Sequence, residues 1–124
     1  MKKIEDKKLL GYFKEILLDF EMSKFPKTEQ IEELKRSLKQ VIKHSKINIL
    51  NVGLIYSYSR HHLANVEKSK VLINDFVKTL NLDFNHYEKH RQQINAEWEY
   101  IRNWFESEYN IEEVGDIYQI SDKQ

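Results

Sequence analysis

Apolar residues recur every three or four positions along almost the whole chain of 124 residues. This spacing places them on one face of an α-helix. Only one proline and three glycines interrupt the pattern. Because each helix must bury its apolar face against another element, the pattern predicts an all-α fold, a compact antiparallel bundle of four to five helices.

The pattern divides into four long segments. The first helix is expected over residues 4–22, and it ends ahead of the single proline because the residue before proline favours extended backbone. The second is expected over residues 28–45 with Thr28 as its N-cap. The third follows residues 47–59 and is expected to continue to about residue 80. The last is expected to run over about 84–109. The residues placed centrally in these stripes form the expected core: Leu17, Leu34, Leu38, Ile73, Val77, Ile94, Trp98 and Ile101.

Two segments have a weaker pattern. Residues 47–59 are apolar nearly all round, and a buried strand and a buried helix look alike at this length. A helix is favoured, because no partner strand is obvious elsewhere in the chain. Residues 111–124 are expected to form a short acidic tail, docked on the bundle or flexible. The apolar residues spaced to dock are Ile111, Val114, Ile117 and Ile120. With no repeat or linker, residues 1–124 are expected to be a single helical domain.

The composition excludes several kinds of chemistry and bears on the compartment. There is no cysteine, so disulfides, thiolate metal sites and cysteine nucleophiles are excluded. The longest uncharged stretch, residues 47–59, is shorter than the roughly 20 residues that span a bilayer. Glu5 and Asp6 interrupt any signal-peptide pattern near Met1. We therefore expect a cytoplasmic protein with no membrane contact.

Catalytic motifs are missing as well. The sequence has no paired Glu-x-x-His, no His-Glu-x-x-His, no nucleophile elbow and no phosphate-binding glycine loop. A protein without catalytic residues or cofactor is therefore expected. One alternative stays open: His86 and His90 are four residues apart, so they share a helix face on which two imidazoles could hold a metal ion in a metal-dependent enzyme.

The charges are balanced overall but unevenly distributed. Residues 35–70 hold eight Lys or Arg against one acid, and residues 97–124 hold eight acids against two basic residues. A charged end of this kind steers association with an oppositely charged partner. The leading hypothesis is therefore a non-enzymatic protein that binds another protein, such as an inhibitor, immunity or accessory factor of a bacterium, phage or plasmid. Its expected contact residues are Glu106, Glu108, Glu112 and Glu113. The alternative that the acidic end pairs with the basic middle, within one chain or across a homodimer, is open.

A second hypothesis concerns residues 47–70. Three stretches of this segment together resemble the helix-turn-helix of TetR-type repressors: Ile49-Leu-Asn-Val52, Tyr58-Ser-Arg-His-His-Leu63 and Ser69-Lys-Val-Leu72. Ser57 stands where that family has a turn glycine. The resemblance covers about 25 residues and implies a DNA-binding regulator. It implies that a recognition helix enters a groove and that lysines contact phosphates. The residues so implied are Arg60, His61, His62, Lys68 and Lys70.

Overall fold

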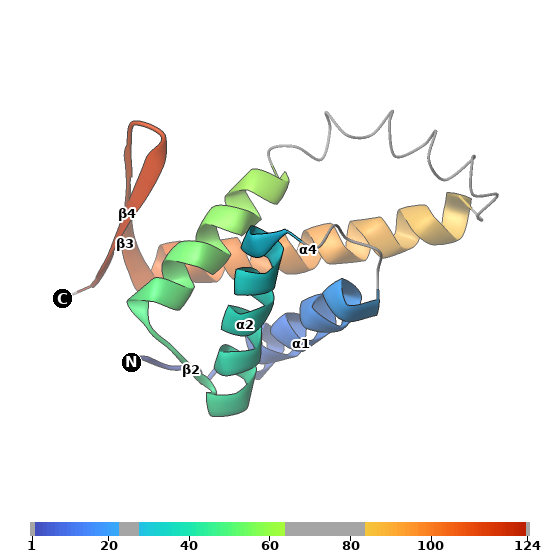
Figure 1. Cartoon of the computed structure of the whole chain (residues 1–124), viewed down its shortest axis with the longest axis horizontal. Coiled ribbons are helices and arrows are strands. Elements are labelled where there is room, and N and C mark those ends of the chain that lie inside the picture. The colour runs from blue at the N-terminus through green and yellow to red at the C-terminus, as the bar shows by residue number, and fades with distance from the viewer. Residues whose placement is uncertain (1, 23–27, 64–83, 124) are drawn as a thin grey trace.

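The computed structural model describes residues 2–22, 28–63 and 84–123 (Figure 1). These residues are mainly helical, as predicted, and they also form two small antiparallel sheets of two strands each, which the sequence did not predict. The expected central residues Ile73 and Val77, and with them the end of the third helix, lie outside the described residues. The complete bundle therefore stays a prediction.

The first two helices begin at polar caps. Helix α1 (Lys7–Met22) follows Asp6, whose Oδ1 accepts hydrogen bonds from two backbone N–H groups of the first turn, at 2.9 and 3.1 Å. Helix α2 (Glu29–His44) begins after Thr28, whose Oγ1 accepts from a backbone N–H at 3.2 Å. The N-cap predicted at Thr28 is confirmed. Helix α2 ends at Ser45, which has a left-handed backbone with a φ of 50°.

A short ladder corrects one expectation about the start of the third segment. Strand β1 (Lys2–Lys3) pairs antiparallel with strand β2 (Lys46–Ile47). The expectation that this region lacks a partner strand was therefore wrong, because the first residues of the chain supply one. A helix begins at residue 49 and is described as far as residue 63, so the helical interpretation of most of residues 47–59 is confirmed. We refer to it as the 49–63 helix.

The last helix, α4 (Phe84–Glu108), ends within one residue of the predicted boundary. It runs antiparallel to α1 and alongside it, while α2 crosses α1 steeply (Figure 1). Of the expected core, Leu17 and Ile94 are only partly buried. Four expected residues are fully buried, as predicted: Leu34, Leu38, Trp98 and Ile101. Among the described residues, no helix combines the length and the apolar character needed to cross a membrane.

The C-terminal residues form a β-hairpin, not the expected tail. Strand β3 (Tyr109–Val114) pairs antiparallel with strand β4 (Ile117–Asp122), from Val114↔Ile117 at the loop to Tyr109↔Asp122 at the base. The loop between them has two residues, and its first, Gly115, has a φ of 61°, as the tight turns of such hairpins require. A local ladder of six residue pairs satisfies the backbone groups that each strand turns toward the other, which a flexible tail would leave to water.

One face of the hairpin packs on the rest of the molecule. Ile111, Tyr118 and Ile120 are partly buried against the core, and the Ile120 side chain lies beside Gly53 of the 49–63 helix. The expectation that Val114 and Ile117 also dock was wrong, since both are exposed. In a strand, successive side chains point to opposite faces, so a helical spacing of three placed these residues on the wrong side.

Candidate functional site

A polar cluster joins three elements at the centre of the hairpin's docking surface. Glu106 of α4 accepts a hydrogen bond from the Tyr56 hydroxyl at 2.9 Å, and its carboxylate lies 3.6 Å from the Arg60 guanidinium. Arg60 also stacks over the ring of Tyr118 in β4, at 5.6 Å from its centroid. Tyr56 and Tyr118 meet edge to face with their centroids 5.3 Å apart. The cluster therefore fixes the hairpin to the 49–63 helix and α4.

Two groups of the cluster, the Tyr56 hydroxyl and the Arg60 guanidinium, keep their protons over the physiological pH range. Burial, and then the hydrogen bond to Glu106, raise the pKa of the Tyr56 hydroxyl to about 12. The hydrogen bond to Tyr118 raises the pKa of Arg60 above its already high ordinary value. The Tyr56 hydroxyl therefore stays protonated and donates, while the Arg60 charge stays present beside Glu106.

The first residues of the chain hold the base of the hairpin. The Lys2 ammonium donates to the Glu108 carboxylate at 2.5 Å and to its backbone carbonyl at 3.1 Å. It also lies 4.9 Å from the ring centroid of Tyr109, which is buried. Burial raises the pKa of the Tyr109 hydroxyl to about 12. Glu106 and Glu108, two of the four residues expected to meet a partner, are thus engaged inside the chain.

The other two expected residues remain available. Glu112 and Glu113 lie on β3, both are exposed, and neither takes part in an ion pair among the described residues. Residues 109–123, which we call the acidic hairpin, contain four acids and one lysine. That lysine, Lys123, donates to the backbone carbonyl of Ser107 at 2.7 Å. The acidic hairpin therefore presents exposed negative charge at the C-terminal end of the described chain.

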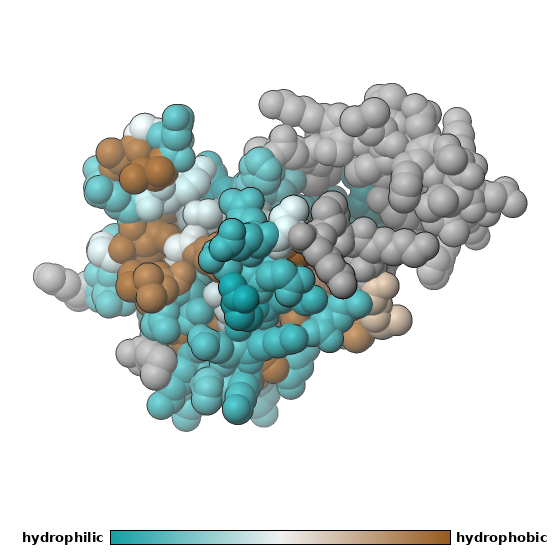
Figure 2. Space-filling model, viewed as in Figure 1, coloured by the Kyte–Doolittle hydropathy of each residue, from teal (hydrophilic) through white to brown (hydrophobic). Residues whose placement is uncertain are grey.

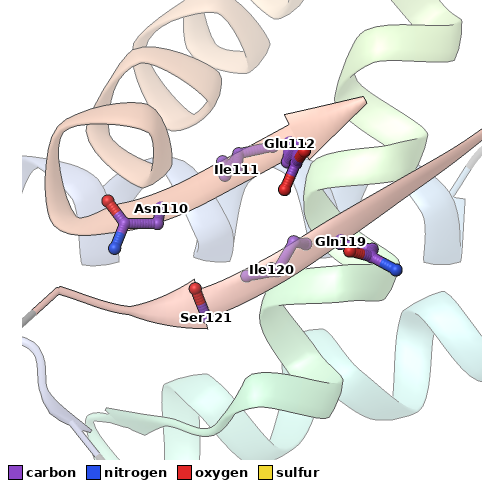
Figure 3. Close-up of a pocket in the computed structure, with 6 residues that line it drawn as sticks. All are labelled: Asn110, Ile111, Glu112, Gln119, Ile120 and Ser121. Atoms are coloured by element: carbon purple, nitrogen blue, oxygen red, sulfur yellow. The ribbon is translucent and has the colours of Figure 1, made fainter. Parts of the chain in front are cut away.

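The outer face of the acidic hairpin is open, and it is polar except at the tip, where Val114 and Ile117 lie. Cross-strand pairs Asn110↔Ser121 and Glu112↔Gln119 place amide, hydroxyl and carboxylate groups on that face. An open pocket of about 510 Å³ lies against the hairpin (Figure 3). Its lining residues are Asn110, Ile111, Glu112, Gln119, Ile120 and Ser121. Such a surface offers hydrogen bonds and negative charge, but no enclosed cavity for a small substrate.

Exposed apolar side chains flank the acidic hairpin. At its tip, Val114 is 42% and Ile117 63% exposed, and at the start of the 49–63 helix Leu50 is 80% exposed. Figure 2 shows hydrophobic surface in separate patches along the hairpin and near the start of this helix, with polar surface around them. Apolar patches rimmed by polar groups are typical of protein contact surfaces.

Three of the five residues implied by the TetR-type resemblance, Arg60, His61 and His62, lie in the described part of the chain. Residues 49–63 are helical throughout, so the turn expected before Arg60 is not formed there. Arg60 pairs with Glu106, whereas His61 is exposed. His62 is partly buried, and its Nε2 lies 2.8 Å from the Asn95 side-chain oxygen. Lys68 and Lys70 lie outside the described residues.

His62 belongs to an aromatic cluster. Its ring stacks on Tyr58 with centroids 6.2 Å apart and lies 6.0 Å from the ring of Trp98. Tyr58 in turn meets Phe20 of α1 edge to face. Burial lowers the pKa of His62 and the neighbouring His61 acts in the same direction, while the hydrogen bond with Asn95 and the charge of Asp19 oppose them. His62 therefore packs the 49–63 helix against α4, and the cluster reaches α1 through Tyr58.

The metal hypothesis receives no test. His86 and His90 lie on α4 as expected, but their side chains are outside the described residues. Among the side chains that the structure describes, no group of three His, Cys, Asp or Glu residues is arranged to hold a metal ion. The site at His86 and His90 stays a prediction.

Sequence reasoning missed the strands and the residues that fix them. Tyr56 and Tyr118 were not singled out, although each makes contacts with charged partners across elements. A signal was present: residues 118–121 alternate apolar or aromatic with polar side chains, and Gly115-Asp116 forms the kind of dipeptide found at hairpin turns. Comparison of the chain with protein-family models, with curated proteins and with solved structures found no match.

Proposed function

We propose that this protein is cytoplasmic and that it acts without catalysis, by binding another protein through its acidic hairpin. The observation that carries the proposal is the exposure of Glu112 and Glu113 on a hairpin fixed at both ends, by the Tyr56–Glu106–Arg60 cluster and by Lys2. A surface held in place before binding loses less conformational entropy on association. Its charge and its exposed apolar tip are the features of a steered protein contact.

The nature of the partner follows from the same charges. Four acids against one lysine favour a partner surface rich in Lys and Arg. A basic surface of this kind belongs to many nucleic-acid-binding proteins, so an inhibitor, immunity or accessory role remains our preferred reading. The DNA-binding alternative has less support, because Arg60 is paired with Glu106 and His62 packs against Trp98.

Charge reversal on the acidic hairpin tests the proposal. The tagged chain is used to capture partners from a native lysate, with and without nuclease, and the captured partner is then purified for binding measurements. We expect Glu112→Lys with Glu113→Lys to weaken binding about tenfold or more at low salt, since each reversal replaces an attraction by a repulsion. Glu106 and Glu108 are left unchanged, because their reversal would break the internal contacts of Tyr56 and Lys2.

A matched control separates the hairpin from charge in general. Glu15→Lys with Glu99→Lys makes the same change in net charge at exposed positions of α1 and α4. This variant is expected to bind the partner almost as the unmodified chain does. Equal losses in both variants, or nuclease-sensitive recovery of DNA with tight binding to random duplexes, would overturn the proposal in favour of a general charge effect or of DNA binding.

A further inference from the structure

The two strands of the acidic hairpin differ in how their outer edges are protected. Within the described residues, β3 and β4 pair only with each other, so each has one outer edge without a neighbouring strand. Edge strands in native proteins are commonly protected by charged side chains. Strand β3 carries Glu112 and Glu113, whereas residues 117–121 of β4 carry no charge. The edge of β4 is therefore the less protected one.

The register shows which backbone groups this edge offers. Directly opposite residues in an antiparallel ladder alternate between pairs that exchange both hydrogen bonds and pairs that exchange none. A two-residue loop closes on a hydrogen-bonded pair, here Val114↔Ile117. It follows that Tyr118 and Ile120 belong to the other kind of pair. Their N–H and C=O groups point outward, where an added strand would pair with them.

Both ends of this edge also carry features that a side chain could contact. Ile117 is 63% exposed at the tip. Beside the other end lies an open pocket of about 540 Å³, to which Asp122 and Lys123 contribute together with Ile49. A strand lying along β4 would therefore have an apolar contact at one end and a partly polar pocket at the other. Backbone pairing with alternate side chains in pockets is the general mode of β-strand addition.

We propose that β4 accepts an extended segment of a partner protein, flanked by Lys or Arg, as an added strand. The proposal rests on the proposed function and names the kind of segment that the acidic hairpin binds. Charge complementarity selects this occupant: a second copy would bring together two hairpins with four acids and one lysine each. A basic segment places its charges beside Glu113, Asp116 and Asp122 instead.

Amide exchange in the intact chain tests the proposal directly. The probe is the synthetic peptide acetyl-Lys-Lys-Thr-Val-Thr-Val-Thr-Lys-Lys-amide, and a second peptide has Glu in place of each Lys. At about 1 mM of the Lys peptide we expect the amides of Tyr118 and Ile120 to become protected from exchange. The affinity of the Glu peptide should be lower than that of the Lys peptide by about tenfold or more.

A backbone variant then removes only the outward donor. The chain is assembled by ligation at Ser107→Cys from two pieces, the second carrying an N-methyl group on the Ile120 amide. The matched control carries the N-methyl group on Glu113, whose amide points outward from β3 by the same register argument. We expect the Ile120 modification to weaken binding of the Lys peptide about tenfold or more. The Glu113 modification should leave it unchanged.

Each other outcome contradicts the proposal. Protection at Ile111 and Glu113 would place the added strand on β3. Protection that grows with protein concentration without peptide would identify a second copy as the occupant. The absence of protection would show that the edge is closed to strands. In each case the strand-addition inference fails. The proposed function still stands if Glu112→Lys with Glu113→Lys weakens binding of the captured partner.

Discussion

Arg60 and Glu106 show what a count of charges omits. They come from the basic middle and the acidic end of the sequence, and they were candidates for two different functions. In the folded chain they lie 3.6 Å apart, and Glu106 also accepts from Tyr56. Part of the charge polarity is thus used for internal pairing, as one open alternative anticipated. Among the acids that stay exposed, Glu112 and Glu113 carry the electrostatic argument for a partner.

The environment of His62 predicts a pH dependence of stability. Burial lowers its pKa in the folded state below the ordinary value of 6.5, so the unfolded state binds the proton more readily. Stability from this residue is therefore complete above pH 6.5 and is lost as the pH falls from there through the lowered folded-state pKa. We expect His62→Gln to reduce the drop in the free energy of unfolding between pH 7.5 and 5, measured by urea denaturation. A drop of unchanged size would show that His62 does not cause it.

At the scale of the element, the sequence predicts helices well and strands poorly. Helices α2 and α4 were predicted to within a residue or two, because their apolar faces repeat over many turns and Thr28 marks one start. Strand β1 has two residues, and its pairing with β2 depends on tertiary proximity that no local pattern shows. The hairpin was mistaken for a tail because short apolar spacings fit both periods. As a result, Glu112 and Glu113 were predicted as binding residues, but the open strand edge was not.

The left-handed end of α2 predicts a stabilising substitution. Ser45 has a φ of 50°, a conformation that costs an L-residue about 1–2 kcal/mol and glycine almost nothing. Its backbone carbonyl, which accepts from the Ile4 N–H at 2.9 Å, is kept in either residue. Ser45→Gly should therefore raise the free energy of unfolding by about 0.5–1 kcal/mol. Ser37→Gly, inside α2, should lower it by about as much. A loss of stability at both positions would contradict the assignment of strain to Ser45.

For the whole molecule, the core is where the sequence prediction holds best. Leu34, Leu38, Trp98 and Ile101 are buried as expected, since each lies at the centre of a long apolar stripe. The same argument predicted that Leu17 is buried, but its side chain is only partly buried. The contact between Lys2 and Glu108, which joins the two ends of the fold, could not be predicted. These residues lie 106 positions apart, and no sequence pattern connects them.

Truncation of one core side chain in α2 and one in α4 measures how much each helix's packing contributes to the free energy of unfolding. Leu38 of α2 and Ile101 of α4 are both fully buried. Leu38→Ala and Ile101→Ala should each lower the free energy of unfolding by about 2–5 kcal/mol, from lost burial and from the cavity that remains. Leu18→Ala, at a position 53% exposed, should change it by less than about 0.5 kcal/mol. Thermal or urea denaturation of the three variants provides the comparison.

The pairing of Lys2 with Glu108 sets an order of events during synthesis. The hairpin and the helices can form from neighbouring residues as soon as these leave the ribosome, because closing short loops is fast. Strand β1 can pair only after Lys46 and Ile47 have been synthesised, and Lys2 can contact Glu108 only after Glu108 has emerged. Until then Ile4, buried in the finished fold, stays accessible to chaperones and proteases. A nascent chain stalled before Glu108 has emerged should therefore be cleaved near its first residues, whereas the completed chain should resist.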